Sequence, residues 1–155
     1  MSEALGDEPI VVTMSESVAT IWLNRSDKRN AMSHEMWTAL AQHCHSLAND
    51  HTVRVLVVRG VGGHFCAGAD IGGFADGMSD EYQAQNREAE EALAAFPRPT
   101  IAFITGSCVG GGVQIAGACD LRFASSHSLI NRMEARPSES LLSGYPLARC
   151  APSFR

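Results

Sequence analysis

The chain has 155 residues, about the length of one domain, and its 45% hydrophobic content is enough for a core and excludes extensive disorder. Its 12 Lys and Arg against 17 Asp and Glu give a net charge of −5 with no basic tract, which excludes a typical nucleic-acid-binding protein. No apolar run is long enough to span a membrane, the acidic start is unlike a signal peptide, and five scattered cysteines are typical of reduced thiols, so we expect a cytoplasmic protein without a membrane partner.

The first half of the chain predicts a hairpin, a helix and a strand. Residues 10–14 and 18–23 are two β-rich runs with a short polar turn between them. Ser33 is placed to cap a helix that reaches about Asn49, because apolar residues recur there at helical spacing. Residues 53–59 predict the next strand and are apolar on both faces at their centre, which is typical of a parallel sheet covered on both sides.

The second half continues the alternation of helices and strands. A helix is predicted from about Ser79 to Phe96, where two prolines end it. Residues 100–105 predict a strand, 113–118 a short helix and 121–124 a last strand. The order β-β-α-β-α-β-α-β predicts an α/β fold with β-α-β crossovers, in which ligands bind in the loops at the carboxyl ends of the strands. We interpret the glutamates of the 79–96 helix as its solvated face: Glu81, Glu88, Glu90 and Glu91.

Two glycine-bearing loops, 65–70 and 106–112, stand at such positions, and each leads from a predicted strand toward a helix. One backbone N–H from each loop can point at a single oxygen atom, and two such donors stabilise negative charge that develops on a carbonyl oxygen. The second loop also opens a helix, whose first N–H groups favour an anion. The pattern indicates enolate or oxyanion chemistry on an acyl substrate. For the triple glycine alone, the alternative is a tight turn packed on a strand.

Competing kinds of site lack their motifs. The loops carry none of the glycine patterns of P-loop, dinucleotide-binding or serine-hydrolase proteins. His43, Cys44 and His45 are neighbours on a predicted helix and face different directions, so they do not converge on a metal. Cys66 and Cys108 flank the proposed donors, and we interpret both as small packing residues rather than nucleophiles.

Several ordered segments together resemble the crotonase family, also called the enoyl-CoA hydratase/isomerase superfamily. They are Ile-Trp-Leu-Asn-Arg at 21–25, Lys-Arg-Asn-Ala-Met at 28–32, His-Phe-Cys-Ala-Gly-Ala-Asp-Ile at 64–71, Phe-Pro-Arg-Pro-Thr-Ile-Ala at 96–102, Gly-Ser-Cys-Val-Gly-Gly-Gly at 106–112 and Cys-Asp-Leu-Arg-Phe-Ala at 119–124. The resemblance covers roughly residues 10–128 and is more specific than any single motif. It implies a spiral of β-β-α units, usually assembled as trimers or dimers of trimers.

The resemblance also implies a substrate and a site. The substrate is an acyl-CoA thioester, and its enolate is stabilised by the backbone N–H groups of Ala69 and Gly111. Six positions match those that line the family's CoA and acyl pocket: Lys28, Arg29, Ala31, Ala67, Asp70 and Ile71. Coenzyme A enters as part of the substrate, and neither a metal nor a redox cofactor is required.

Two departures from the family pattern affect the expected chemistry. Where the hydratases have a glutamate that works on the water, this chain has Gln114, whose amide has no proton to titrate and is left to orient a water or a substrate. The second hydratase glutamate falls on Glu134, but its neighbours differ from the family's Phe-Gly and Leu-Gly, and we interpret the match as a coincidence. Isomerisation, or another enolate reaction with a base elsewhere, therefore fits better than hydration.

The end of the chain differs from the rest. From Ile130 onward it is rich in Arg, Pro, Ser and Ala and shows neither helical nor strand periodicity. We therefore divide the chain into a crotonase-like core at 1–128 and an atypical tail at 129–155. Because the family core normally continues further, we expect a truncated version of the fold, produced by a frame change or a premature end.

Three functional hypotheses follow. The first is a crotonase-family enzyme of the hydratase/isomerase type that acts on acyl-CoA. The second is a non-catalytic remnant or regulatory chain, which keeps the start of the fold without the acid or base. The third is a relative that binds a nucleotide without acyl chemistry, and tight binding of ADP with no preference for acyl-CoA would favour it.

Overall fold

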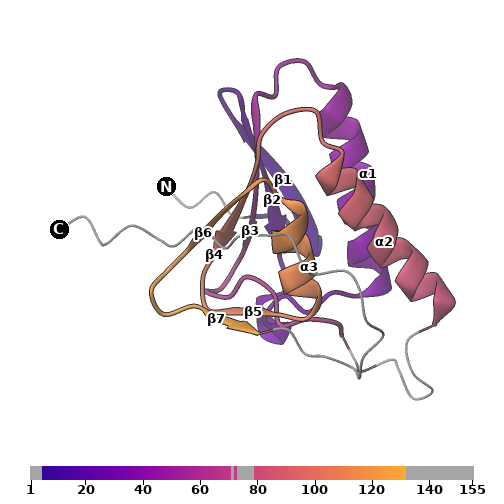
Figure 1. The fold of residues 1–155 in the computed structure, drawn as a ribbon, viewed down its shortest axis with the longest axis vertical. Helices are drawn as coiled ribbons and strands as arrows, with labels where there is room; N and C mark the ends of the chain where they lie inside the picture. The colour runs from indigo at the N-terminus through magenta and orange to yellow at the C-terminus, as the bar shows by residue number, and fades with distance from the viewer. Residues whose placement is uncertain (1–4, 71, 73–78, 132–155) are drawn as a thin grey trace.

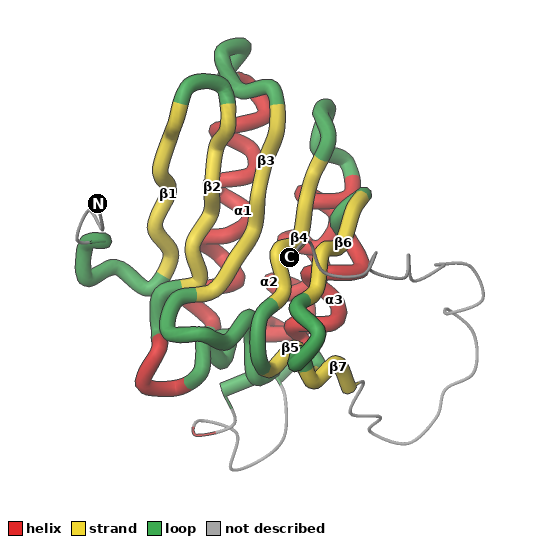
Figure 2. Tube along the Cα trace, turned by 90° about the vertical axis from the view of Figure 1, so that its left-hand side faces the viewer, coloured by secondary structure: helices red, strands yellow, loops and turns green. Residues whose placement is uncertain are grey.

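A computed structural model describes residues 5–70, 72 and 79–131 of the chain. Five strands form one sheet in the order β1-β2-β3-β4-β6, and the described helices pack against one of its faces (Figures 1 and 2). The strands are β1 (Ile10–Ser15), β2 (Val18–Leu23), β3 (Val55–Gly60), β4 (Thr100–Ile104) and β6 (Leu121–Ala124). The helices are α1 (His34–Asn49), α2 (Asp80–Ala94) and α3 (Gly111–Ala118), with a short 3-10 turn, η1 (Ser26–Lys28). The α/β fold is confirmed.

The strand directions place the loops of interest together. β1 and β2 form an antiparallel hairpin, and every later strand of this sheet runs parallel to its neighbour. The helices α1, α2 and α3 each connect two of the parallel strands and lie on the same side of the sheet. Because β2, β3 and β4 run in parallel, their carboxyl ends lie at the same end of the sheet. The segments that follow these three ends carry the residues predicted to form the site.

Serine caps fix where the first two helices begin. The Ser33 hydroxyl accepts a hydrogen bond from the Met36 N–H at 3.3 Å, and the Ser79 hydroxyl accepts one from the Tyr82 N–H at 3.1 Å. At the far end of α1, the Arg98 guanidinium donates to the carbonyl oxygen of Ala48 at 2.5 Å. This contact satisfies one of the carbonyls that a helix end leaves without a partner.

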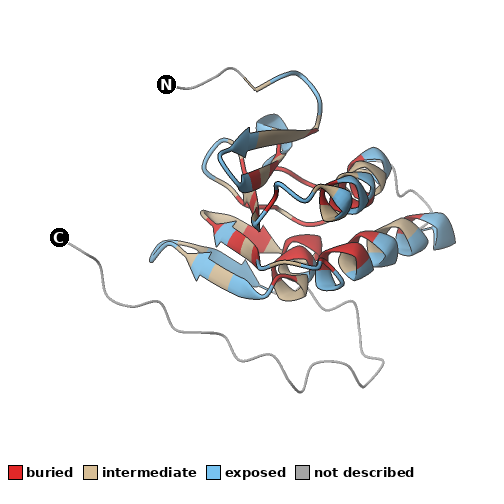
Figure 3. Cartoon of the chain, turned by 90° about the horizontal axis from the view of Figure 1, so that it is seen from above, coloured by how far each residue is buried: buried red, intermediate tan, exposed pale blue. Residues whose placement is uncertain are grey.

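The core lies between the sheet and the helices, where Figure 3 shows the buried residues gathered. β2, β3 and β4 contribute alternate residues to it, and α1 contributes an apolar stripe. Its fully buried members include Ile21, Trp37, Leu56, Ala102 and Ile115. Removing this apolar surface from water is what holds the helices on the sheet.

The other face of the sheet corrects one prediction. One row crosses all five strands in register: Val11, Trp22, Arg59, Phe103 and Phe123. Within it, the Arg59 guanidinium carbon lies 4.5 Å from the Trp22 ring centroid and 5.0 Å from that of Phe103. Phe103 is 42% exposed and Phe123 is 52% exposed. The sequence of β3 predicted a sheet covered on both sides, but among the described residues the helices cover one face only (Figure 2).

Two short strands were not predicted. β5 (Ser107–Val109) and β7 (Leu129–Asn131) pair in parallel as a separate two-stranded sheet. Three residues are too few to show a period, and β5 lies inside the second glycine loop. β7 extends into the stretch from Ile130 onward, for which no regular structure was expected. None of the helices in the described part of the chain has the length and apolar content that crossing a membrane requires.

Candidate active site

The two glycine-bearing loops lie against each other. Cys66 and Cys108 face each other in a parallel β-bridge, in which the Cys66 N–H donates to the Ser107 carbonyl and the Val109 N–H donates to the Cys66 carbonyl, both at 2.9 Å. A Cβ placed on Gly110 would lie 3.7 Å from the Cα of Gly68. Backbone hydrogen bonds therefore fix the spacing of the two loops, and no side chain separates them at their closest approach.

Glycine is needed at that closest approach for a second reason. Gly68 has φ +104° and Gly110 has φ +51°, a region of backbone conformation that L side chains rarely adopt. Each of these glycines immediately precedes one of the predicted donors, Ala69 and Gly111. The local backbone therefore turns just before each donor residue.

The segment that carries Ala69 is held by backbone hydrogen bonds to Met32. The Met32 N–H donates to the Gly68 carbonyl at 2.7 Å, and the Asp70 N–H donates to the Met32 carbonyl at 2.9 Å. In such a parallel bridge the residue between the two bonds turns its own N–H to the opposite side. The Ala69 N–H is therefore directed away from Met32.

Both predicted donors have an N–H without an acceptor in the described part of the chain. Neither the Ala69 N–H nor the Gly111 N–H donates a hydrogen bond to any described residue. Gly111 is the first residue of α3, where helix geometry provides no partner for the N–H. A ligand oxygen that accepts from these groups would displace no protein contact with a described residue.

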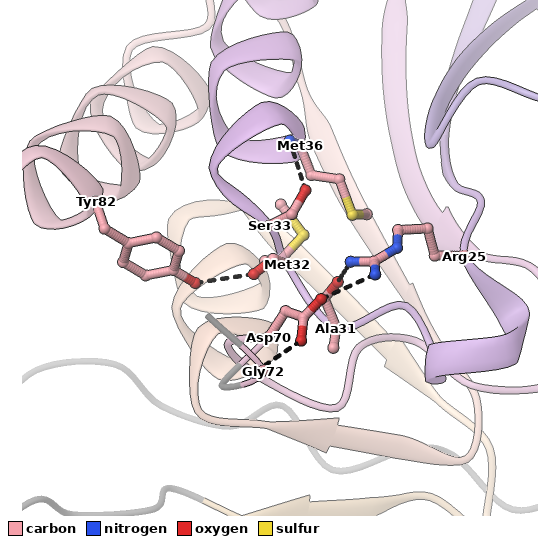
Figure 4. Close-up of polar contacts among 8 residues, drawn as sticks. All are labelled: Arg25, Ala31, Met32, Ser33, Met36, Asp70, Gly72 and Tyr82. Atoms are coloured by element: carbon pink, nitrogen blue, oxygen red, sulfur yellow. Dashed lines mark hydrogen bonds and ion pairs between the residues drawn. The ribbon is translucent and has the colours of Figure 1, made fainter. Parts of the chain in front are cut away.

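An ion pair links the loop before α1 to the Ala69 segment. The Arg25 guanidinium donates to the Asp70 carboxylate at 2.8 Å and to the Ala31 carbonyl at 3.0 Å (Figure 4). The hydrogen bond from Arg25 is the main reason why the pKa of Asp70 lies below its usual value. Asp70 thus stays ionised near neutral pH, and its part in this ion pair is structural.

Asn30 links the loop before α1 to the loop that follows β3. This residue is fully buried, its amide oxygen accepts from the Arg25 N–H at 2.9 Å, and its amide nitrogen donates to the carbonyls of Val61 and His64 at 2.9 and 2.8 Å. Sequence reasoning did not single it out for this role. Its φ of +58°, in the left-handed region that asparagine tolerates, is consistent with a selected turn residue.

Most of the predicted pocket residues come together near this site. Lys28 and Arg29 are exposed at the end of η1, and the Arg29 carbonyl accepts from the Ala67 N–H at 3.0 Å. Ala31 is buried beside Met32, within the segment that Arg25 binds. Ile71 and Glu134 lie outside the described residues.

Gln114 lies one turn into α3 and is exposed. Its side-chain oxygen accepts from the Asn86 amide of α2 at 3.1 Å, and it would lie 3.8 Å from a Cβ placed on Gly111. The amide is therefore close to a predicted donor and carries no titratable proton. Asn86 is thus a second polar residue beside Gly111, and the helical periodicity of the 79–96 segment did not indicate its contact with Gln114.

Glu90 differs from the sequence-based prediction. It was assigned to the solvated face of α2, but one of its carboxylate oxygens is buried with no hydrogen-bond partner in the described part of the chain. Burial raises the pKa of Glu90 above its ordinary value. It lies one helical turn from Asn86, so the two side chains share a face of α2.

The thiols beside the donors are buried, as the packing interpretation expected. Cys66 and Cys108 are both fully buried, and burial raises the pKa of each thiol to about 12. A thiol that stays protonated at neutral pH is a poor nucleophile and a poor metal ligand. In the described ranges, no cluster of three His, Cys, Asp or Glu side chains could hold a metal ion.

Comparison with known proteins shows the family to which the chain belongs. Residues 13–137 match the family model described as enoyl-CoA hydratase/isomerase. The chain belongs to that family. The probable enoyl-CoA hydratase echA6 of Mycobacterium bovis is 38% identical over 113 residues, which are 73% of this chain and 45% of that protein. The mitochondrial enoyl-CoA hydratase domain-containing protein 2 of Bos taurus is 38% identical over 133 residues, covering 77% of this chain and 42% of that protein.

Solved structures of the enoyl-CoA hydratase/isomerase family share the fold. A crystal structure of an enoyl-CoA hydratase/carnithine racemase from Magnetospirillum magneticum superposes with a TM-score of 0.77 at 32% identity, over 83% of this chain and 50% of that one. An enoyl-CoA hydratase from Bacillus anthracis gives a TM-score of 0.73 at 31% identity. The crotonase-like fold is thus confirmed, and the chain spans about half the length of the relatives it matches.

Proposed function

We propose that this chain binds an acyl-CoA thioester and stabilises the enolate of its acyl group through the N–H groups of Ala69 and Gly111. The observation that carries the proposal is that both N–H groups lack an acceptor among the described residues, on two loops that backbone hydrogen bonds hold side by side. Such fixed donors favour the charge on an enolate oxygen more than the dipole of the ground-state carbonyl.

The CoA portion is assigned to the segment before α1. Lys28 and Arg29 are exposed cations on the chain that pairs with the Ala69 segment. Cations at that place suit the phosphates of CoA, since charge-assisted hydrogen bonds to phosphate are strong. Trimeric assembly and a cytoplasmic location remain predictions for this chain.

The reaction is an enolate reaction rather than simple hydration. Gln114 stands at the position of the hydratase glutamate and cannot accept a proton from water near neutral pH. The Asn86–Gln114 amide pair suits a role in orienting the acyl group by hydrogen bonds. Removal of a proton from the α-carbon by another base is the step that the two donors would favour.

The first test is exchange of the α-protons of butyryl-CoA in D₂O, followed by NMR of the thioester. The proposal predicts exchange above the rate without protein, together with tighter binding of butyryl-CoA than of free CoA in calorimetry. If the protein shows neither exchange of the α-protons nor tighter binding of butyryl-CoA than of free CoA, the proposal is contradicted.

A second candidate function, a non-catalytic acyl-CoA-binding chain, is favoured by Gln114 alone. It predicts preferential binding of butyryl-CoA with no exchange of the α-protons. The same two measurements therefore separate the candidates.

A further inference from the structure

A buried tyrosine on α2 holds the segment that carries Ala69. Tyr82 is 1% exposed, and its hydroxyl donates to the Met32 carbonyl at 3.0 Å (Figure 4). That carbonyl also accepts from the Asp70 N–H at 2.9 Å. The Met32 carbonyl oxygen, which binds the residue after Ala69, thus accepts from two donors. One is the Asp70 N–H in the loop, and the other is the Tyr82 hydroxyl on α2.

A buried tryptophan on α1 contacts the other donor. Trp37 is fully buried, and a Cβ placed on Gly111 would lie 3.0 Å from the Cζ2 atom of its indole. The start of α3 therefore lies close to the edge of this ring, and a side chain at position 111 would require the ring to shift slightly. Because protein interiors are closely packed, replacing the indole by a smaller ring changes the packing beside the Gly111 backbone.

The two aromatic rings contact each other. Trp37 and Tyr82 are arranged edge to face, with ring centroids 6.3 Å apart and planes at 86°. The His34 ring packs on Tyr82 in the same manner, with centroids 5.0 Å apart. Burial raises the pKa of Tyr82, so its hydroxyl remains a donor at neutral pH. A continuous set of contacts thus runs from the Ala69 segment through two rings to Gly111.

We propose that Tyr82 and Trp37 are positioning residues, which together set the orientation of the Ala69 and Gly111 N–H groups within the spacing that the backbone bonds at Cys66 and Cys108 fix. The effect on catalysis rests on the proposed function, but the placement of the two N–H groups can be measured without substrate. Neither residue touches the reacting atoms in this account. Their effect on the reaction passes through Met32 and through the start of α3.

The test compares Tyr82→Phe and Trp37→Phe with the control Thr100→Val. Thr100 is buried at the start of β4, and its hydroxyl donates a hydrogen bond to the carboxylate of Asp120, which follows the end of α3, at 2.9 Å. Thr100→Val therefore also removes a buried hydroxyl, but at the end of β4 away from the two glycine-bearing loops. The ¹H and ¹⁵N shifts and the solvent exchange of the Ala69 and Gly111 amides are measured in the ligand-free protein. Tyr82→Phe should move the Ala69 amide, and Trp37→Phe should move both. Thr100→Val should move neither.

Turnover provides the second readout. Tyr82→Phe should lower the rate of α-proton exchange by about tenfold, because a small misplacement of a catalytic group is costly, while the affinity for free CoA stays the same. An Ala69 amide that is unaffected by Tyr82→Phe would overturn the inference. If the amides respond as expected and the wild-type chain shows no exchange at all, the proposed function fails while the placement by Tyr82 and Trp37 stands.

Discussion

Cys66 and Cys108 face each other across the junction of two loops, and the backbone bonds on either side of this pair set the distance between the loops. The same junction limits which residues α3 can carry. A Cβ placed on Gly112 would lie 2.7 Å from the Cys66 carbonyl oxygen and 2.9 Å from its Cβ. Glycine at 112 is thus required by contact between two backbones, and not by a ligand.

Gly112→Ala should therefore destabilise the protein by about 1–3 kcal/mol, since the loop or the helix must move to admit the methyl group. Gly117 is a matched control in the same helix, because a Cβ there meets nothing within 4 Å. Gly117→Ala should stabilise by up to about 1 kcal/mol through helix propensity. Chemical unfolding monitored by circular dichroism measures both. Equal effects of the two substitutions would contradict this account of the junction.

The cysteines give a prediction about reactivity. Cys44, Cys66, Cys108 and Cys119 are buried free thiols, and burial raises the pKa of each to about 12. In a Cys150→Ser variant at pH 8, Ellman's reagent should label none of the four in the folded protein and all four in denaturant. Rapid labelling of Cys66 or Cys108 in the folded protein would show that a thiol beside the donors is accessible.

Features set by local chemistry were predictable from the sequence, and those set by tertiary contacts were not. Ser33 was predicted as a helix cap because a cap depends on a residue only three positions away, and the next helix was predicted to start at about Ser79. The hydroxyl of Tyr82 binds a carbonyl 50 residues earlier in the chain, and no local pattern encodes that pair. Likewise, the apolar centre of β3 could not reveal that the helices cover one face.

Arg25 offers a test of the link between the loops. Arg25→Met removes the hydrogen bonds to the Asp70 carboxylate and the Ala31 carbonyl, and should cost about 1 kcal/mol of unfolding free energy, because the pair is partly exposed. Arg54→Met, at an exposed arginine, is the control and should have little effect.

The Arg25 effect should depend on pH in one direction. The pKa of Asp70 is lowered in the folded protein, so the stabilisation is complete above its unfolded pKa of about 4. It is lost as the pH falls through the lower, folded value. The stability difference between wild type and Arg25→Met should thus be constant at neutral pH and shrink in acid. A difference that grows in acid would contradict this assignment.

Glu90 should show the opposite sign. Its pKa is raised in the folded protein, so ionisation opposes folding, and stability falls as the pH rises from the unfolded pKa through the folded one. Glu90→Gln should remove that dependence and stabilise the protein at pH 7. The gain is expected to be small, because Glu90 is only partly buried and water screens its charge. Exposed Glu81, also on α2, provides the control for the removal of one carboxylate from this helix.

The second of the two proposed donors, the Gly111 N–H, can be tested on its own. Proline is tolerated at the first position of a helix, so Gly111→Pro removes the N–H while it keeps α3. Gly111→Ala adds the same Cβ beside Trp37 and keeps the N–H. If the donor acts as proposed, Gly111→Pro should slow the exchange of α-protons by about 10²–10³-fold relative to Gly111→Ala.

The most direct measurement is the infrared stretch of a ¹³C-labelled thioester carbonyl in butyryl-CoA bound to the protein. Two hydrogen bonds from Ala69 and Gly111 should lower its frequency relative to the free thioester, both in the wild type and in Gly111→Ala, and the lowering should be smaller in Gly111→Pro. A bound carbonyl with the frequency of the free thioester in the wild type would contradict the claim that these two N–H groups hold the substrate oxygen.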